Sequence, residues 1–235
     1  LDYVILDGQH GVAGFDRTVA QLQAADASGI TPLVRIAALD PALMMRLLDA
    51  GAMGIVVPDI TTREQAQAAV GAVRFKHGEA AGNRGACPST RAALRSGMDW
   101  SSFVQWSNQN VLLWLIIESV AGLDNFAEIV TIKGVDAYLM GTFDLSHELG
   151  VFGQRSHPEV NSRFVDLART AQAHGVPVVR SIRSSNPEAL REEVREWRAL
   201  GACAFGLGAD RPMMRNAYAD KVNVTRAALK DAGVS

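Results

Sequence analysis

Short apolar runs, rich in β-branched residues, recur along the chain, and helical patterns separate each run from the next. Most of the runs are apolar at nearly every position, which is typical of parallel strands that are buried on both faces. This alternation of strands and helices predicts an α/β fold with a parallel sheet. The predicted strands are residues 3–6, 32–36, 54–57, 112–118, 137–140, 176–182 and 202–207.

Capping residues mark the ends of the predicted helices. Residues 41–50 form a helical pattern that ends at Gly51, with Asp40 as the candidate N-cap and Pro41 in the first turn. Further helices are predicted at residues 63–74, 158–174 and 187–200.

The length of 235 residues fits one domain, residues 1–235, with the fold of a (β/α)8 TIM barrel. Seven strands alone leave a doubly wound open sheet as an alternative. The dinucleotide-binding pattern G-x-G-x-x-G follows none of the strands, since Gly206-Leu-Gly208 lacks the third glycine. Leu1 lies almost inside the first predicted strand, so we expect preceding residues that include the first strand of the barrel.

Composition argues against several classes of protein. Lys and Arg total 23 against 25 Asp and Glu, so the basic excess of a nucleic-acid-binding protein is lacking. No run of about 18 apolar residues occurs, so we expect no membrane span. Cys87 and Cys203 stand in unrelated contexts and form neither a metal-binding pair nor a disulfide framework, which indicates a reducing, cytoplasmic location.

One segment, residues 77–110, breaks the alternation. It is rich in Gly, Ser, Asn, Arg and Ala, shows no clear strand, and carries Arg84, Arg91 and Trp106. It is about three times longer than an ordinary connection, and long connections are often functional. A surface excursion or a subunit contact is the alternative.

Polar side chains stand where the predicted strands end. Asp7 and His10 follow the first strand, Arg35 lies at the end of the second, Glu118 ends the fourth, and Asp144 comes shortly after the fifth. Because the carboxyl ends of barrel strands line one mouth, these side chains are expected to converge there.

Glu118 and Asp144 lie about one βα unit apart, so they are expected on adjacent strand ends. Two carboxylates without Cys or His beside them make a hard oxygen site, which suits Mg²⁺ or Mn²⁺. The alternative is that each acid is an ordinary strand-end residue, with Asp144 capping a helix.

His10 and Arg35 are candidates for the chemistry itself. Histidine exchanges protons near neutral pH, so His10 is a candidate general base, although a loop histidine bound to a backbone carbonyl is the alternative. Arg35 closes an apolar strand and therefore requires an anionic partner. That partner is either a carboxylate or enolate substrate, held by a bidentate fork, or a structural salt bridge.

These segments resemble the class II pyruvate aldolases of the HpcH/HpaI family, which includes 4-hydroxy-2-oxoheptanedioate aldolase and 2-dehydro-3-deoxyglucarate aldolase and extends to macrophomate synthase. The resemblance covers nearly the whole chain, and its order and spacing are specific. The motifs that carry it are Asp7-Gly-Gln-His10-Gly, Leu33-Val-Arg35, Leu47-Leu-Asp49-Ala-Gly51, Ile117-Glu118-Ser and Gly141-Thr-Phe-Asp144-Leu-Ser.

The resemblance implies a TIM barrel with a strand and helix before the Asp7 motif, assembled as a homohexamer in which the last helix often packs on a neighbour. It implies reversible cleavage of a 4-hydroxy-2-oxo acid to a 2-oxo acid, such as pyruvate, and an aldehyde. A divalent metal ion, Mg²⁺, Mn²⁺ or Co²⁺, would be held by Glu118 and Asp144.

The resemblance also implies roles for individual residues. Arg35 would stabilise the enolate, and His10 would act as the general base, directly or through water. Asp49 would orient His10, while Asp144 and the backbone amides near Phe143 would contact the substrate. No Schiff-base lysine is required, and no predicted strand contains a lysine.

Three positions depart from the family pattern. Gln9 stands where the family usually has Glu, Ile116 stands where a substrate-contacting Gln is common, and Phe143 falls in a Gly-Thr-Phe-Asp sequence that replaces Gly-Pro-small-Asp. Ile116 and Phe143 predict a tighter, more apolar pocket and an altered preference for donor or acceptor.

The same set of residues is compatible with other functions. The same residues would serve decarboxylation of oxaloacetate with carbon–carbon bond formation, as in macrophomate synthase. They would also serve a CoA-thioester lyase, which predicts a basic, nucleotide-sized groove. A barrel that binds an anionic metabolite without turnover is the non-enzymatic alternative, but binding alone does not require a base.

Overall fold

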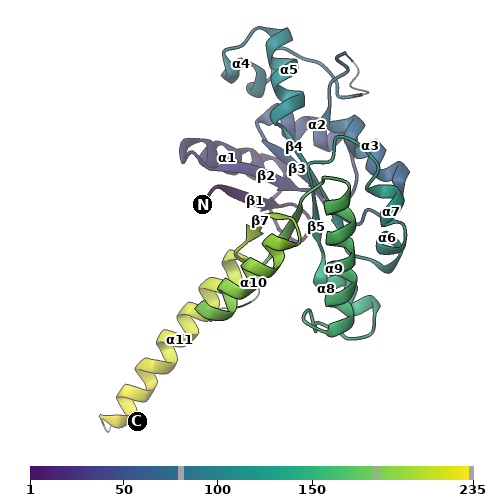
Figure 1. Cartoon of the computed structure of the whole chain (residues 1–235). Helices are drawn as coiled ribbons and strands as arrows, with labels where there is room; N and C mark the ends of the chain where they lie inside the picture. The colour runs from purple at the N-terminus through teal and green to yellow at the C-terminus, as the bar shows by residue number, and fades with distance from the viewer. Residues whose placement is uncertain (79–81, 183, 185, 233–235) are drawn as a thin grey trace.

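The computed structural model describes residues 1–78, 82–182, 184 and 186–232. Its strands form one parallel sheet in which each strand pairs with the next along the chain (Figure 1). All the predicted strands are confirmed to within two residues. They are β1 (Tyr3–Asp7), β2 (Thr31–Arg35), β3 (Gly54–Val57), β4 (Leu112–Ile117), β5 (Ala137–Met140), β6 (Val178–Ser181) and β7 (Ala202–Gly206).

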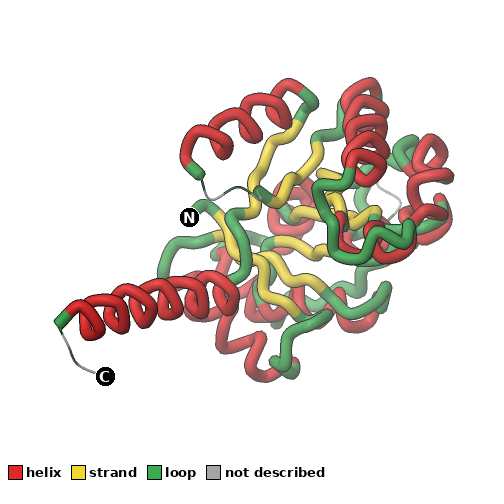
Figure 2. The backbone as a smooth tube through the Cα atoms, turned by 90° about the horizontal axis from the view of Figure 1, so that it is seen from below, coloured by secondary structure: helices red, strands yellow, loops and turns green. Residues whose placement is uncertain are grey.

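The sheet curls like part of a barrel wall, and most helices lie outside it (Figures 1 and 2). Among the described residues, no pairing joins β1 to β7, so a closed eight-stranded barrel is not formed. The helices are α1 (Phe15–Ala27), α2 (Pro41–Ala50), α3 (Arg63–Val73), α4 (Arg91–Ser96), α5 (Trp100–Asn110), α6 (Val120–Asp124), α7 (Phe126–Ile129), α8 (Thr142–Glu148), α9 (Pro158–Ala173), α10 (Pro187–Ala199) and α11 (Asp210–Asp231).

The helix ends follow the capping chemistry of the sequence. The Asp40 side chain accepts hydrogen bonds from the N–H groups of Ala42 and Leu43, at 2.9 and 3.0 Å, and so begins α2. Gly51 ends α2 with a φ of 110°, a conformation that costs glycine little. The predicted helices at 41–50, 63–74, 158–174 and 187–200 are confirmed to within one residue.

Two apolar layers flank the sheet. The outer layer packs against the helices and includes Val34, Ile55, Leu113 and Tyr138. The inner layer is formed by the opposite faces of the same strands: Leu33, Val56, Trp114, Ile116, Ala137 and Val179, with Tyr3 and Ile5 packed on them. Because successive side chains of a strand point to opposite faces, this alternation places Asp7, Arg35 and Glu118 on the inner face, at the carboxyl ends of their strands.

The segment from 77 to 110 contains α4 and α5, which the sequence did not predict; residues 79–81 lie outside the described residues. Both helices have side-chain N-caps, Thr90 and Asp99, and Gly97 ends the first in a left-handed conformation. A satellite core of Phe75, Ala93, Phe103 and Val104 fixes the segment to the rest of the molecule. The segment is therefore a packed helical insertion.

The last helix, α11, has no buried residue and extends away from the sheet (Figures 1 and 2). Large apolar side chains are nevertheless exposed on it, among them Met214, Tyr218, Val222 and Leu229. No helix in the described part of the chain is long and apolar enough to cross a membrane.

Candidate active site

The carboxyl edge of the sheet brings together most of the side chains that the sequence singled out. Asp7 and Arg35 end β1 and β2, and Glu118 directly follows β4. Asp144 lies in the first turn of α8, which begins two residues after β5. The charges of Asp144 and Arg35 both act on Glu118, so these groups share one electrostatic environment.

Glu118 is the most enclosed acid of this edge, at 8% exposure. Its Oε1 accepts a hydrogen bond from the backbone N–H of Asp59 at 2.9 Å. Burial raises the pKa of Glu118 to about 7, and the negative charges of Asp144 and Asp59 act in the same direction. The Asp59 hydrogen bond and the positive charge of Arg35 oppose that rise without cancelling it.

Gly141 gives Glu118 its place against β5. A methyl group on Gly141 would overlap the Cβ of Glu118 and lie 2.6 Å from its Oε2. The two oxygens of Glu118 are therefore directed to opposite sides of β4. Oε1 accepts from the Asp59 N–H, which follows β3, and Oε2 points towards Gly141, which follows β5.

Asp144 is exposed and occupies the third position of α8. The alternative that it caps this helix is wrong, because Gly141 is the N-cap and no side chain caps α8. A negative charge in the first turn is favourable there, since the exposed N–H groups make the helix start positive. In the part of the chain that the structure describes, no hydrogen bond or ion pair engages the Asp144 carboxylate, and its charge acts on Glu118.

Arg35 is engaged by Asp7 in a bidentate fork. Its Nε donates to Asp7 Oδ1 at 3.0 Å, and its Nη2 donates to Asp7 Oδ2 at 2.8 Å. Burial alone would raise the pKa of Asp7, but the hydrogen bonds from Arg35 and from the backbone of His10 and Gln9 bring it below its ordinary value. The salt-bridge alternative for Arg35 is thus present, and sequence reasoning missed Asp7 as its partner.

His10 is exposed and lines a cavity of about 2030 Å³ on the inner side of the sheet. Asp7 and Arg35 line the same cavity, and so do Ile116 of the inner layer and Leu139, which packs against that layer. Ile116 thus makes part of an apolar surface inside a cavity that also contains the charged pair. Phe143 is 52% exposed in the first turn of α8, and its ring centroid lies 4.8 Å from that of His147.

Asp49, for which the resemblance implied a role beside His10, lies away from this edge within the single chain. It lies in the last turn of α2, and a helix that follows a parallel strand runs back towards the amino ends of the strands. There its Oδ1 accepts a hydrogen bond from Arg84 Nη2 at 2.8 Å. In the described part of the chain no interaction links Asp49 to His10, so within one chain Asp49 does not orient His10.

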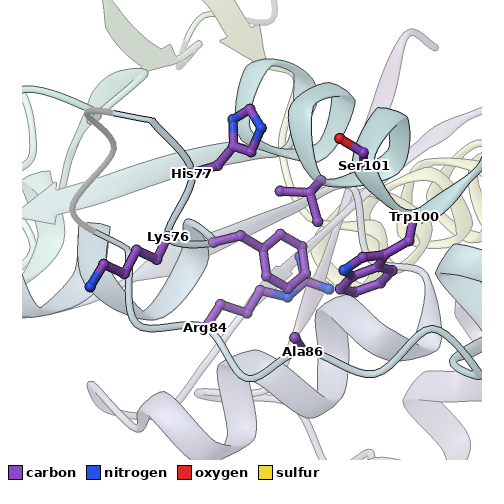
Figure 3. Close-up of a pocket in the computed structure, with 8 residues that line it drawn as sticks. Lys76, His77, Arg84, Ala86, Trp100 and Ser101 are labelled. Atoms are coloured by element: carbon purple, nitrogen blue, oxygen red, sulfur yellow. The ribbon is translucent and has the colours of Figure 1, made fainter.

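Arg84, the partner of Asp49, lines a second, smaller cavity of about 280 Å³ (Figure 3). The Arg84 guanidinium lies over the Phe75 ring, 4.4 Å from its centroid, and also donates to Ser107 Oγ at 3.2 Å. Lys76, His77 and Trp100 also line this cavity (Figure 3). Arg84 therefore fastens the helical insertion to α2, and this cavity is separate from the carboxyl edge.

The donor set at the carboxyl edge fits a hard divalent cation. Glu118 is a buried carboxylate that is difficult to ionise, as expected where a cation is required to balance neighbouring negative charges. No group of three potential ligands occurs in the described residues, so the chain would supply two carboxylates. Mg²⁺ and related ions are commonly bound by one or two carboxylates, with water and substrate oxygens completing the shell.

The metal-free protein is expected to lose the stabilising contribution of Glu118 as the pH rises from 4.5 to about 7. The folded state holds the Glu118 proton more tightly than the unfolded chain, so the contribution is complete below 4.5 and lost above about 7. The size is about 3 kcal/mol, on the order of 1.4 kcal/mol for each pH unit.

Urea unfolding of the wild type and of Glu118→Gln, at about pH 4.5 and pH 8, measures this effect in the absence of metal. The free energy of unfolding of the wild type should fall relative to the variant by about 3 kcal/mol between the two pH values. A difference that stays constant would show that Glu118 is not held in a desolvated position.

Comparison with known proteins gives a consistent assignment. The family model described as HpcH/HpaI aldolase/citrate lyase matches residues 1–207. The 5-keto-4-deoxy-D-glucarate aldolase of Shigella dysenteriae serotype 1 (strain Sd197) is 32% identical over 216 residues, which cover 92% of this chain and 80% of the relative.

Two solved structures share the fold. The HpcH/HpaI aldolase from Desulfitobacterium hafniense DCB-2 is similar with a TM-score of 0.85 at 27% identity, over 96% of this chain and 84% of that chain. Macrophomate synthase is similar in fold alone, with a TM-score of 0.82 at 24% identity, over 98% and 78% of the two chains.

Proposed function

This chain belongs to the HpcH/HpaI aldolase/citrate lyase family and is a carbon–carbon lyase, and on that premise we propose that its site forms the enolate of a 2-oxo acid. The reaction is the reversible cleavage of a 4-hydroxy-2-oxo acid into a 2-oxo acid, such as pyruvate, and an aldehyde. The observation that carries this proposal is the buried Glu118, which shares one edge of the sheet with Asp144 and Arg35.

We propose that Glu118 and Asp144 hold a divalent metal ion, Mg²⁺, Mn²⁺ or Co²⁺. When bound there, such an ion acts as a Lewis acid towards the oxygens of the 2-oxo acid and favours the enolate. The hard carboxylate donors support this choice of ions but do not select one of them.

In the cleavage direction, His10 removes the proton of the 4-hydroxyl group. The bond between carbons 3 and 4 breaks, the aldehyde leaves, and the electron pair remains on the enolate of the 2-oxo acid. A proton then returns to carbon 3. The exposed position of His10 in the cavity that contains Arg35 supports this role.

Arg35 places positive charge where the enolate develops, and Asp7 fixes its orientation through the bidentate fork. In the described residues no hydrogen bond involves Nη1 of Arg35, so this atom remains available to a substrate. The N–H groups in the first turn of α8, next to Phe143 and Asp144, would receive the substrate carboxylate, since a helix start leaves such groups without internal acceptors.

The substrate of this chain is proposed to be less polar at the acceptor end than a sugar acid. Ile116 lines the cavity with Val56 and Leu139, and none of the three offers a hydrogen bond to a hydroxyl group. The relative is named for a hydroxylated sugar acid, 5-keto-4-deoxy-D-glucarate. Gln9 and Phe143 are further differences beside the site.

We also propose that residues 1–235 belong to one eight-stranded barrel, that the protein acts in the cytoplasm, and that it assembles as a homohexamer. Among the described residues, β1 and β7 each pair with one strand only, which leaves room for an eighth strand between them. The free thiols of Cys87 and Cys203 fit a reducing compartment. The exposed face of Met214, Tyr218, Val222 and Leu229 on α11 fits a contact with a neighbouring copy. Light scattering would measure the assembly.

The function is tested by incubating the purified protein with pyruvate in D₂O and following the methyl proton signal. Loss of that signal is expected with Mg²⁺ or Mn²⁺ and should stop when EDTA removes the ion. Addition of aldehydes of increasing polarity would then identify the acceptor. Absence of exchange with several metals and several 2-oxo acids would rule out enolate formation and favour a binding protein.

A further inference from the structure

Asp59 has a backbone conformation that is unusual for its residue type. Its φ is 52°, and in the described residues it is the one non-glycine residue with a positive φ. For L-residues the left-handed region costs roughly 1–2 kcal/mol, although Asp and Asn tolerate it better than most. Such strained residues persist only where the surrounding structure holds them, and they cluster at functional sites.

The structure shows what this conformation achieves. In this conformation the Asp59 N–H donates to Glu118 Oε1 at 2.9 Å. The next residue, Ile60, is 1% exposed and donates its N–H to the Ile116 carbonyl at 3.2 Å. Two hydrogen bonds therefore fix the chain after β3 to β4. Asp59 donates to the Glu118 side chain, and Ile60 donates to the Ile116 backbone.

Glu118 is consequently restrained from two directions. The Asp59 N–H holds Oε1 on the β3 side, and the missing side chain of Gly141 makes room for Oε2 on the β5 side, where α8 and Asp144 begin. A carboxylate that is fixed in this way loses little conformational freedom when it binds a cation.

We propose that Asp59 is a positioning residue for the metal site, and that it acts through its backbone N–H and its left-handed turn. This inference rests on the proposed function, because it assumes that Glu118 binds the metal ion. Asp59 is not proposed as a third ligand, since the described residues contain no group of three potential ligands. Its exposed carboxylate adds negative charge near the site but does not hold Glu118.

Four changes at position 59 separate the backbone from the charge. Asp59→Asn and Asp59→Gly remove the carboxylate but keep the N–H and tolerate the left-handed turn. Asp59→Pro removes the N–H and fixes φ near −65°, so it removes both features of the turn. Replacement of the peptide N–H of residue 59 by an ester oxygen removes the hydrogen-bond donor and keeps the side chain.

The readout is the dissociation constant for Mn²⁺, measured by the electron paramagnetic resonance signal of the free ion in the absence of substrate. We expect Asp59→Pro and the ester to weaken Mn²⁺ binding by about tenfold, since a hydrogen bond to a charged group is worth at least that factor. Asp59→Asn and Asp59→Gly should stay within about threefold of the wild type, because the charge they remove is exposed and screened.

Gly29→Pro is the matched control. Gly29 also has a left-handed φ, 67°, and donates its N–H to a carbonyl, that of Asp26, but it lies between α1 and β2, away from the carboxyl edge. The Gly29→Pro variant should have a lower melting temperature than the wild type but the same dissociation constant for Mn²⁺. If Asp59→Pro does not fold, the ester still decides the question, because it changes neither φ nor the side chain.

The outcomes keep the two proposals apart. A wild type that does not bind Mn²⁺ overturns the proposed metal site, and the inference with it. A wild type that binds Mn²⁺, with the ester and Asp59→Pro binding equally well, overturns only the role of Asp59. If Asp59→Asn bound Mn²⁺ as weakly as the ester does, the effect would belong to the Asp59 carboxylate. That result would also overturn the proposed role of the Asp59 backbone.

Discussion

Glu118→Gln is expected to lower the rate of metal-dependent proton exchange from pyruvate by about a thousandfold, which corresponds to a loss of about 4 kcal/mol of transition-state stabilisation. Gln has nearly the shape of Glu, and its amide oxygen can still accept the Asp59 N–H, so the fold should persist. The variant lacks the negative charge that balances a divalent cation, and the proposed function requires that charge.

Glu148→Gln is the matched control for this variant. Glu148 also accepts a backbone hydrogen bond, from Val120 N–H at 2.6 Å, but it is exposed at the end of α8. Its exchange rate should equal that of the wild type. If Glu118→Gln exchanged pyruvate protons as fast as Glu148→Gln does, Glu118 would have no place in the chemistry.

Gly141→Ala is expected to weaken Mn²⁺ binding and pyruvate exchange by about a hundredfold each, because fixed ligands lose affinity when displaced by fractions of an ångström. The added methyl group would overlap the Cβ of Glu118 and approach its Oε2, so Glu118 must leave its position. The φ of Gly141 is −84°, which alanine adopts freely, so the effect is steric and not conformational.

Gly14→Ala provides the comparison, since Gly14 also precedes a helix, has a φ of −75°, and would have no atom within 4 Å of the added methyl group. Titration with Mn²⁺ and the D₂O exchange assay should show no change for this variant. Wild-type affinity in Gly141→Ala would mean that the position of Glu118 between β3 and β5 does not matter for the metal.

The strands and helices were predictable because each depends on local properties of the sequence. Strands that are buried on both faces require continuous apolar runs, and residues 54–57 and 137–140 stand out on that criterion. Asp40 and Gly51 delimit α2 by capping chemistry that acts within a few residues. The helices α4 and α5 were missed because they lie in a segment rich in Gly, Ser and Asn, where no clear apolar pattern marks them.

The sequence predicted the positions of those site residues that lie at the ends of strands. Glu118 and Arg35 could be placed at one edge because parallel strands share a direction. The Asp7–Arg35 fork depends on the register of β1 against β2, which pairs these two residues and which the sequence does not state. The contact of Asp49 with Arg84 depends on the direction of α2, and the role of Asp59 depends on a positive φ, and neither leaves a pattern in the sequence.

The most direct test of the metal site is anomalous diffraction from crystals of the wild-type protein soaked in Mn²⁺. The proposal predicts one strong peak at the carboxyl edge of the sheet, about 2.1 Å from an oxygen of Glu118 and from an oxygen of Asp144. The peak should be absent from crystals of Glu118→Gln. A fully occupied Mn²⁺ ion elsewhere, with no peak between these two carboxylates, would contradict the account.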